Sequence, residues 1–342
     1  MHRSGKEARA VERPEPVKHA FRMVDPETLR RRPSAVAPMP TARSRSLISF
    51  THPPRREVRA VFAAVAVAIV ATALLVVQIP PTVYAIDVFG ALREPGEPAF
   101  TVGHRGDRAT APENTMPSLE LAMDELAFVE TDVQLTRDGV PVLFHDVTLE
   151  RVTGDVRTIG ELDLAEVRRL DAGAWYAPEF AGTPIPTLEE FFTALAERDS
   201  ARALVELKAD WTREEVRKVT DLVDRHGLRG RVVLQSFSLE TLVSLQAVAP
   251  TLPRIMLIRE LPADPVPLAE RLGLIGFGTT VESVTAQPGA LVLAHEAGIA
   301  VLCYTLNSDE HWETVNALGV DGIITDEPSE LDAWLAVTSP GT

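Results

Sequence analysis

Residues 128–146, FVETDVQLTRDGVPVLFHD, contain two short apolar runs, and both runs include residues able to carry chemistry. The first run is FVETDVQL and the second is VPVLFHD, with the turn-forming residues TRDG between them. Short runs rich in Val, Leu and Phe that are bounded by turn residues are typical of buried strands. This stretch therefore predicts two strands with polar side chains at or near their ends.

The same kind of run recurs along the chain. Amphipathic segments such as residues 212–227 and 308–319 lie between most of the runs. Strands that alternate with helices predict a parallel sheet with right-handed crossovers. The seven further runs are AFTVGH (99–104), ARALVELK (201–208), RVVLQSF (231–237), RIMLIR (254–259), LIGFGTT (274–280), IAVLCYTLN (299–307) and DGIITD (321–326).

Eight or nine such runs favour a closed barrel over an open sheet. We therefore predict an α/β protein with a (β/α)8 TIM barrel over residues 99–338. Residues 147–184 break the alternation and predict a small insertion after the third strand.

The region before the barrel has a different composition. Residues 1–59 are rich in Arg, Pro and Ser and lack apolar periodicity, which predicts a disordered basic tail. Residues 60–79 begin with eighteen uncharged residues, and as a helix these would span about 27 Å of a bilayer core of about 30 Å. This segment predicts one transmembrane helix, and the Pro- and Gly-spaced residues 80–98 predict a linker.

The flanking charges predict the orientation of this helix. Arg55, Arg56 and Arg59 precede it, and the twelve residues after Val77 contain no Lys or Arg. Because positive flanks stay in the cytoplasm, we expect a cytoplasmic tail and a single-pass anchor that holds the barrel outside the cytoplasm. Two alternatives stay open. The small residues at 83–85 would suit signal cleavage and secretion, and the apolar segment could instead be a buried core helix.

Charge and cysteine content limit the classes of partner. The chain carries −15 at pH 7, but residues 1–59 hold fourteen Lys and Arg against six Asp and Glu. The rest of the chain therefore carries −23, which argues against nucleic acid as a partner of the barrel. Cys303 is the single cysteine, so neither an internal disulfide nor a cysteine-based metal site can form.

Ionisable residues stand where the predicted strands end. In a parallel barrel the carboxyl ends of the strands meet at one rim, where active sites are built. Residues two apart point to the same side of a strand, so we expect these side chains to share one space. They are His104 and Arg105 after the first run, Glu130 and Asp132 in the second, His145 in the third, and Glu206 and Lys208 in the fourth.

Glu130, Asp132 and Glu206 would repel one another in a buried space, because buried charge is costly unless it is paired or binds a cation. The hard cations Ca²⁺ and Mg²⁺ prefer such carboxylate oxygens, and the lack of thiolates disfavours zinc or iron. The alternative is a set of structural salt bridges with Arg105 and Lys208. Carboxylates at two separate strand ends, with histidines at two others, favour a divalent metal site.

The neighbouring residues suit cleavage of a phosphodiester. Arg105 offers a planar fork for phosphate oxygens, and Lys208 offers a point charge. His104 and His145 can exchange protons near neutral pH, one as base and one as acid. A bound metal would polarise a phosphoryl oxygen.

Six motifs, GHRGDRATAPENT, ETDVQLTRDGVPVLFHD, ELK, LQSF, YTLN and DGIITDEP, resemble the glycerophosphodiester phosphodiesterase family in order and approximate spacing. The resemblance covers about residues 99–337, including the insertion, and implies a TIM-barrel enzyme related to the phosphatidylinositol phospholipases C. It implies hydrolysis of small glycerophosphodiesters to glycerol 3-phosphate and an alcohol. It also implies metal ligation by Glu130, Asp132 and Glu206, acid–base catalysis by His104 and His145, and phosphate binding by Arg105 and Lys208.

Other residues are expected around or behind the pocket. Glu113 is expected to orient Arg105 or His104, with metal ligation as the alternative. Asn114 is expected to cap the helix that follows it. Tyr304 stands where the family often carries Trp. The full set is Glu113, Asn114, Trp175, Gln235, Tyr304 and Asn307.

Two other functions stay open. A phospholipase C- or D-like enzyme on the same barrel would act on intact or lyso-lipids, although anionic lipid surfaces would repel the acidic barrel. A non-catalytic barrel that binds glycerophosphate polymers of a cell envelope would have no need of two histidines and three carboxylates. Hydrolysis of a small glycerophosphodiester is therefore favoured.

Overall fold

The computed structural model describes residues 83–338. The predicted tail, transmembrane helix and first residues of the linker lie outside this part of the chain. Among the described residues, no helix combines the length and the apolar character needed to cross a bilayer.

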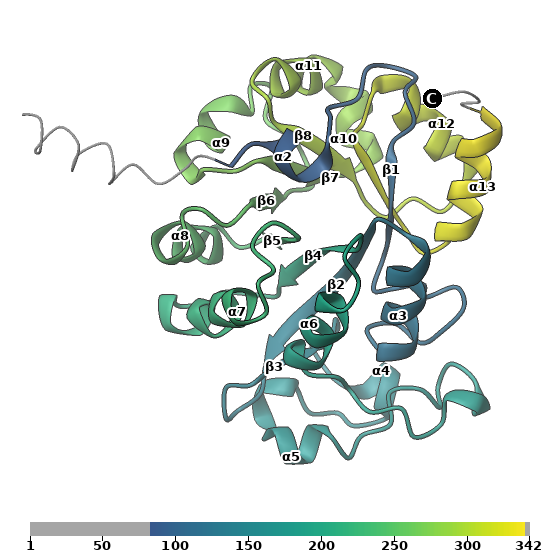
Figure 1. Cartoon of the computed structure of the whole chain (residues 1–342), viewed down its shortest axis with the longest axis vertical. Coiled ribbons are helices and arrows are strands. Elements are labelled where there is room, and N and C mark those ends of the chain that lie inside the picture. Colours follow the sequence, from purple (N-terminus) through teal and green to yellow (C-terminus); the bar gives the residue numbers. More distant parts are fainter. Residues whose placement is uncertain (1–82, 339–342) are drawn as a thin grey trace, which may run out of the picture. The chain divides into compact units, whose positions relative to one another are not determined.

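Eight parallel strands form a closed barrel (Figure 1). β1 pairs with β9 on one side and with β2 on the other, which closes the ring. The predicted TIM barrel is confirmed. Its strands are β1 (Phe100–Gly103), β2 (Phe128–Leu135), β4 (Arg202–Leu207), β5 (Val232–Ser236), β6 (Arg254–Leu257), β7 (Gly276–Thr279), β8 (Ala300–Cys303) and β9 (Gly322–Thr325).

Helices surround the strands (Figure 1), and large side chains such as Phe191, Phe277 and Trp312 are buried. Capping boxes start two of these helices, because Thr187 and Thr212 each accept a hydrogen bond from the backbone of a Glu three residues later. The helices are α3 (Met116–Glu125), α6 (Leu188–Ala196), α7 (Arg213–Arg225), α8 (Leu239–Val248), α9 (Val266–Leu272), α10 (Val281–Ala286), α11 (Pro288–Glu296), α12 (Asp309–Leu318) and α13 (Pro328–Thr338).

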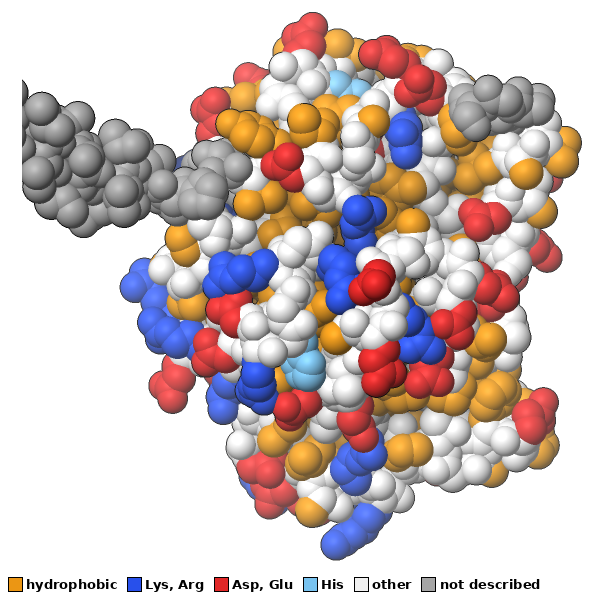
Figure 2. Space-filling model, viewed as in Figure 1, with side chains coloured by type: hydrophobic (Ala, Val, Ile, Leu, Met, Phe, Trp, Pro, Cys, Tyr) orange, Lys and Arg blue, Asp and Glu red, His pale blue; other side chains and the backbone are white. Residues whose placement is uncertain are grey.

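The surface carries charges of both signs. Figure 2 shows acidic and basic side chains interspersed over the viewed face.

One of the nine apolar runs is not a barrel strand. β3 (Pro141–Leu143) pairs antiparallel with β2 and lies at the edge of the sheet. Parallel strands need a crossover of a dozen or more residues, whereas a short turn joins antiparallel strands. The few residues between β2 and β3 therefore already favoured a hairpin, and the insertion follows the second strand of the barrel.

The insertion has a small apolar core of its own. Leu149, Ile159 and Leu162 are buried there with residues that flank them. Its short elements are α4 (Glu150–Thr153), η2 (Ile159–Glu161), α5 (Leu164–Val167) and η3 (Pro178–Phe180). Figure 1 shows this segment at one end of the molecule, beside β3.

Part of the predicted linker is instead a buried helix, α2 (Ala85–Phe89). Ala85, Val88 and Phe89 are buried and pack with residues inside the barrel, including Val102 and Phe128. Apolar residues at positions i, i+3 and i+4 form one helical face. The prediction of a linker over residues 80–98 overlooked this short pattern.

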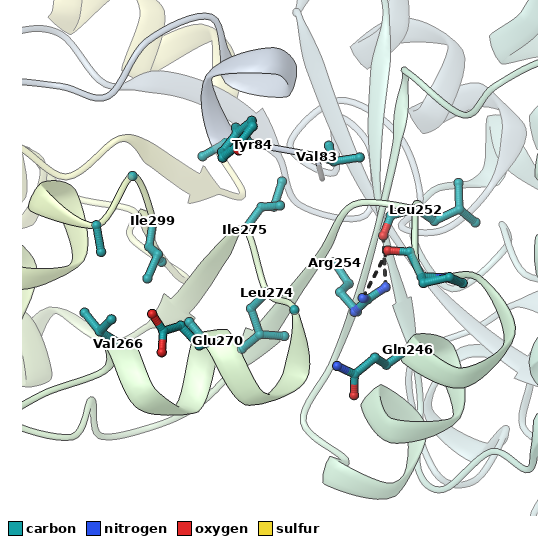
Figure 3. A pocket seen from close by; sticks show the side chains of 16 residues that line it. Val83, Tyr84, Gln246, Leu252, Arg254, Val266, Glu270, Leu274, Ile275 and Ile299 are labelled. Carbon is teal, nitrogen blue, oxygen red and sulfur yellow. Dashed lines mark hydrogen bonds between the residues drawn. The ribbon is translucent and has the colours of Figure 1, made fainter. Parts of the chain in front are cut away.

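A cavity of about 520 Å³ lies at the amino ends of β6, β7 and β8 (Figure 3). Its wall includes Arg254, which is buried and donates hydrogen bonds to the carbonyls of Ala249, Leu252 and Leu272. Burial lowers the pKa of Arg254 to about 10. The carbonyls of Ala249 and Leu272 lie at the carboxyl-terminal ends of α8 and α9, where the helix dipole favours a cation. Arg254 therefore fixes how the two helices meet β6.

The buried position of α2 predicts a large effect of Phe89→Ala on stability. The Phe89 ring lies 5.1 Å from the Phe100 ring and 5.6 Å from the Phe128 ring, between centroids. We expect the free energy of unfolding, measured by urea denaturation, to fall by about 3–5 kcal/mol. Ile86→Ala is the control, because Ile86 is exposed on the same helix. Equal effects of the two substitutions would contradict the buried helix.

Candidate active site

A second cavity, of about 170 Å³, opens at the carboxyl ends of the strands. Eight of the residues predicted from the sequence line it, and Asp132 lies next to Glu130 and Glu206. Strand ends far apart in the sequence therefore meet as predicted. The lining residues are His104, Arg105, Glu130, His145, Glu206, Lys208, Gln235, Phe237, Leu257, Tyr304, Thr305 and Ile324.

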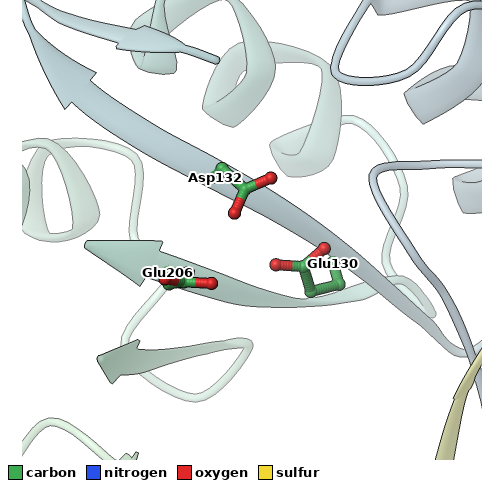
Figure 4. A group of neighbouring side chains, drawn as sticks. All are labelled: Glu130, Asp132 and Glu206. Carbon is green, nitrogen blue, oxygen red and sulfur yellow. The ribbon is translucent and has the colours of Figure 1, made fainter. Parts of the chain in front are cut away.

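Three carboxylates form the centre of the site. Figure 4 shows Glu130 and Asp132 projecting from β2 toward Glu206 on β4. All three are buried, and one oxygen from each lies within 4.8 Å of the others. The pairing of β2 with β4 sets Asp132 directly beside Glu206. Buried carboxylate oxygens in this arrangement fit a hard divalent cation.

Gln235 adds a further oxygen near this cluster. Its Nε2 donates a hydrogen bond to Glu130 Oε1 at 3.2 Å. Its Oε1 is buried and has no hydrogen-bond donor among the described residues. A buried amide oxygen without a donor is costly, so its presence here also fits a site that holds a cation.

The carboxylates differ in charge state. Burial, Asp132 and Glu206 raise the pKa of Glu130 well above its usual range. Burial and Asp132 also raise the pKa of Glu206 to about 7, although Lys208 acts in the opposite direction. For Asp132, burial is outweighed by Lys208 and Arg105, and the pKa falls to about 2. Asp132 therefore carries most of the negative charge of the metal-free cluster at neutral pH.

His104 forms a pair with a carboxylate. Its Nδ1 lies 2.6 Å from Asp326 Oδ1, and Asn307 Nδ2 donates to Asp326 Oδ2 at 2.8 Å. Asp326 follows β9, so the last strand of the barrel orients an imidazole attached to the first. Asn307, which was expected around or behind the pocket, contacts Asp326 and is not among the residues that line the cavity.

His145 forms a second pair of the same kind. Its Nδ1 lies 2.7 Å from Oδ1 of Asp146, the next residue. His145 follows β3 rather than a barrel strand, yet it lines the same cavity as His104. In each pair a carboxylate holds Nδ1, which leaves Nε2 as the second nitrogen able to exchange a proton.

Arg105, the residue after His104, contacts the carboxylate cluster through both its backbone and its side chain. Its backbone φ of 59° is in the left-handed region, where its N–H donates to Glu130 Oε2 at 3.0 Å. Its Nη1 donates to Glu113 Oε1 at 2.7 Å, and its Nε lies 3.4 Å from Asp132 Oδ2. These contacts hold the backbone of Arg105 in this strained conformation. Glu113, expected to orient Arg105 or His104 with metal ligation as the alternative, contacts Arg105 and lies outside the carboxylate cluster.

Lys208 is the second basic residue that contacts the carboxylates. Its Nζ is 3.0 Å from Glu206 Oε1 and 3.4 Å from Asp132 Oδ1. Asp132 and Glu206 raise the pKa of Lys208 despite its burial, which acts in the opposite direction. The ammonium group therefore stays charged beside the cavity.

Asn114 does not cap a helix as predicted. Thr115 is the residue that precedes α3. The Asn114 Nδ2 donates to Asp132 Oδ2 at 2.9 Å, and its Oδ1 accepts from Thr131 and from the backbone of Asp132. A φ of 53° turns Asn114 toward β2, so the side chain orients Asp132.

Aromatic residues are placed in two ways. Tyr304 lines the cavity and packs edge to face against Phe237, with ring centroids 5.7 Å apart. Trp175 is not among the residues that line the cavity, and its ring instead lies 5.2 Å from the guanidinium carbon of Arg151. Phe237 was missed because it has no ionisable group, although it ends the run RVVLQSF that supplies Gln235.

Arg108 and Arg151 were not predicted from the sequence, and no role was predicted for Asp146 and Asp326. Both carboxylates were visible at the ends of apolar runs, and Asp146 directly follows His145, which was selected. The contacts that single out these arginines join distant segments, because Arg108 pairs with Asp326 and Arg151 pairs with Glu113.

Comparisons with known proteins identify the family of the chain. A closed barrel with acidic and basic groups at its carboxyl rim defines a TIM-barrel enzyme, and its class follows from a sequence profile that matches residues 104–330. That profile is the "Glycerophosphoryl diester phosphodiesterase family". The chain belongs to this family and is a phosphodiesterase.

Two curated relatives show how far the similarity extends. The chain is 31% identical to the glycerophosphodiester phosphodiesterase of Caldanaerobacter subterraneus subsp. tengcongensis over 237 residues, which cover 68% of this chain and 96% of that protein. It is 28% identical to a Bacillus subtilis glycerophosphodiester phosphodiesterase over 249 residues, which cover 67% and 84%.

Solved structures are similar over the same region. An Oleispira antarctica phosphodiesterase in complex with the product sn-glycerol-3-phosphate matches with a TM-score of 0.65 and 29% identity, over 69% of this chain and 96% of that one. A glycerophosphodiester phosphodiesterase from Agrobacterium tumefaciens matches with a TM-score of 0.61 and 28% identity, over 69% and 99%.

The carboxylate cluster predicts how stability depends on pH without a divalent cation. Because the folded-state pKa of Glu206 is about 7, above the usual 4.5, its stabilising contribution is complete below pH 4.5 and is lost as the pH rises to about 7. In EDTA, we expect the melting temperature to fall between pH 5 and pH 7.5 more steeply in the wild type than in Glu206→Gln. Saturating Ca²⁺ or Mg²⁺ should restore the wild type at pH 7.5.

Glu197→Gln is the matched control for this prediction, because Glu197 is exposed. It should keep the pH dependence of the wild type. If Glu206→Gln had the same slope as the wild type and neither cation raised the melting temperature, the cluster would not be a metal site.

Proposed function

We propose that this phosphodiesterase hydrolyses small glycerophosphodiesters to glycerol 3-phosphate and an alcohol, with two histidines as acid and base and with Ca²⁺ or Mg²⁺ as cofactor. One observation carries the proposal: two histidine–carboxylate pairs and a three-carboxylate cluster meet at a single cavity. The similar Oleispira antarctica enzyme in complex with sn-glycerol-3-phosphate supports the choice of product.

The charged residues would bind the phosphodiester. Glu130, Asp132 and Glu206 would hold the cation, which when bound would polarise a non-bridging oxygen and neutralise negative charge. Arg105 and Lys208 both line the cavity and would contact the phosphate oxygens. Lys208 would then divide its donors between the phosphate and the two carboxylates that it contacts here.

His104 is the proposed base of the first step. Burial lowers the pKa of His104 despite its hydrogen bond with Asp326, which favours the neutral imidazole. With Nδ1–H donating to Asp326, Nε2 would accept the proton of the glycerol hydroxyl next to the phosphate. That hydroxyl oxygen would form a bond to phosphorus while the bond from phosphorus to the alcohol oxygen breaks.

His145 is the proposed acid of that step. It would donate a proton to the departing alkoxide, and Asp146 would stabilise its imidazolium form. In the second step His145 would take a proton from water, which opens the cyclic phosphate. His104 would return its proton to the glycerol oxygen that leaves phosphorus. Each histidine therefore ends the cycle in its starting state.

The cavity supports a small substrate. Its volume of about 170 Å³ is below the range of about 300–1,000 Å³ typical of drug-sized ligands. A glycerophosphoryl group fits this space, and the alcohol would lie at the mouth near Phe237 and Tyr304. Intact phospholipid is the weaker candidate substrate. A binder of glycerophosphate polymers would not need the histidine–carboxylate pairs.

Hydrolysis of glycerophosphocholine tests this proposal. We expect turnover with Ca²⁺ or Mg²⁺, loss of turnover in EDTA, and recovery when the cation is added back. His104→Ala and His145→Ala should each lower kcat by about 10²- to 10⁴-fold, as measured by release of glycerol 3-phosphate. Glu130→Gln should lower activity and raise the cation concentration that is needed.

His311→Ala is the control for the histidine variants, because His311 is exposed. An analogue in which hydrogen replaces the glycerol hydroxyl next to the phosphate should resist cleavage. Equal cleavage of the analogue would contradict the cyclic intermediate. Faster cleavage of phosphatidylcholine than of glycerophosphocholine would favour the phospholipase, and activity that resists EDTA would contradict the metal.

We also propose a location outside the cytoplasm, on the sequence of residues 55–79 alone. An apolar segment that follows a cluster of arginines favours a retained single-pass anchor with the barrel outside the cytoplasm. The full chain should then resist alkaline carbonate extraction from membranes, and external protease should reach the barrel in intact cells. Recovery of the barrel in the medium would favour the cleaved signal, and recovery in the soluble cytoplasmic fraction would contradict both.

A further inference from the structure

Two arginines behind the cavity have no role in the reaction described above. Arg108 follows β1, and Arg151 lies on α4 in the insertion. Neither lines the cavity. Each contacts Glu113 and one of the two carboxylates that hold a histidine.

The first connection runs from Glu113 to His145. Arg151 Nη2 and Nη1 donate to the two oxygens of Glu113 at 2.6 and 3.1 Å. Its Nε donates to Asp146 Oδ2 at 2.6 Å, and Asp146 Oδ1 holds His145 Nδ1 at 2.7 Å. With both Asp146 oxygens engaged, the plane of the carboxylate fixes the direction of the imidazole.

The second connection runs from Glu113 to His104. Arg108 Nη2 lies 3.0 Å from Glu113 Oε2. Its Nη1 donates to Asp326 Oδ1 at 3.2 Å, and the same oxygen lies 2.6 Å from His104 Nδ1. The order of groups is therefore the same as on the other side: carboxylate, arginine, carboxylate, histidine.

Glu113 is the centre of both connections. It is buried and contacts three guanidinium groups, those of Arg105, Arg108 and Arg151. Burial alone would raise its pKa, but these arginines outweigh burial and lower it. A buried carboxylate is stable where charged hydrogen bonds satisfy both of its oxygens. Removing its charge would leave the arginines around it without a shared partner.

We propose that Arg108, Glu113 and Arg151 form an ionic bridge that positions His104 and His145 as one unit. The three are positioning residues, since they act through Asp326 and Asp146. The proposal rests on the proposed function for its kinetic consequences, but the bridge itself is a statement about two imidazoles. It also gives the insertion a role in the reaction, because Arg151 belongs to the insertion and the histidines do not lie within residues 147–184.

Trp175 supports the insertion side of the bridge. Its ring stacks on Arg151 at 5.2 Å, and its Nε1 donates to the carbonyl of Ala172 at 2.9 Å. A guanidinium over an indole ring is attracted by the quadrupole of the ring. Trp175 therefore gives Arg151 a third contact, in addition to those with Glu113 and Asp146.

Kinetics of single and double variants test the bridge. Arg151→Ala and Arg108→Ala should each lower kcat on glycerophosphocholine by about 10- to 100-fold, as is typical when a residue that orients a ligand group is removed. KM should change by less than about 3-fold, because Arg105 still pairs with Glu113. The double variant should lose less than the product of the two single losses, because the first substitution already breaks the bridge.

Arg157→Ala is the matched control, because Arg157 also lies in the insertion and pairs with Asp155 and Glu166 outside the bridge. It should leave kcat and KM unchanged. Guanidinium should partly rescue Arg151→Ala and should have no effect on the wild type. Losses that multiply in the double variant, or an equal loss in Arg157→Ala, would overturn the bridge.

Proton NMR tests the bridge without reference to activity. Imidazole Nδ1–H protons that bond to carboxylates give downfield signals, which His104→Ala and His145→Ala would assign. Arg151→Ala should shift the signals of both histidines, and so should Arg108→Ala, whereas Arg157→Ala should shift neither. If each arginine moved only the signal of its own histidine, the two connections would be independent and the bridge would be wrong.

These measurements separate the two proposals. A wild-type protein that does not cleave glycerophosphocholine, yet shows coupled imidazole signals, would overturn the proposed function and support the bridge. Cleavage of glycerophosphocholine by a protein whose imidazole signals are not coupled would support the proposed function and overturn the bridge. Arg151→Lys covers the case in which the alanine variant does not fold, and it should also shift both signals, because an ammonium group cannot contact Glu113 and Asp146 with the same fork.

Discussion

Mutual repulsion among three buried carboxylates is the constraint on which the site depends. The register of β2 and β4 sets Asp132 beside Glu206, and the pleat puts Glu130 on the same side. Stable burial of such a cluster requires positive charge close by. Lys208 and Arg105 supply part of it and lower the pKa of Asp132. The pKa of Glu206 is still raised by burial and by Asp132, so this positive charge does not balance the whole cluster. The remaining imbalance is the physical reason to propose a divalent cation.

The second constraint is that the two histidines are held by different parts of the fold. His104 depends on Asp326 at the end of β9, so its orientation requires the barrel to close. His145 depends on Asp146 and, through it, on Arg151 in the insertion. The barrel alone therefore does not supply every contact that orients the two histidines, because Arg151 comes from the insertion. Segments from the first strand, the last strand and the insertion must all fold before both imidazoles are fixed.

The sequence predicts the barrel and the seven central residues for a local reason. Apolar runs predict the strands, and residues two apart point to the same side of a strand. The residues at the carboxyl-terminal rim of the barrel could therefore be predicted from the ends of the runs. Side-chain partners far apart in the sequence were not predictable in this way. Asp326 and His104 are 222 residues apart, and their contact depends on ring closure rather than on any pattern near either residue.

The errors have an equally physical origin. β3 was counted with the barrel because an apolar run reveals burial but not direction, and the turn before it was the overlooked signal. Residues 85–89 were assigned to a linker because five residues are too few for helical periodicity to stand out. Asn114 was read as a cap from its position before a helix, whereas its positive φ turns it toward Asp132. Asn suits both roles, so only its contact with Asp132 shows which role Asn114 has.

The amount of charge at the rim argues for chemistry rather than binding alone. A binding site for a glycerophosphate needs positive charge and hydrogen-bond donors, which Arg105 and Lys208 supply. Three buried carboxylates oppose the binding of an anion and lower the stability of the metal-free fold. Such an arrangement is understandable where a cation reverses the sign of the cluster and the transition state carries more charge than the substrate. Two imidazoles held through Nδ1 would supply the proton transfers of the proposed reaction.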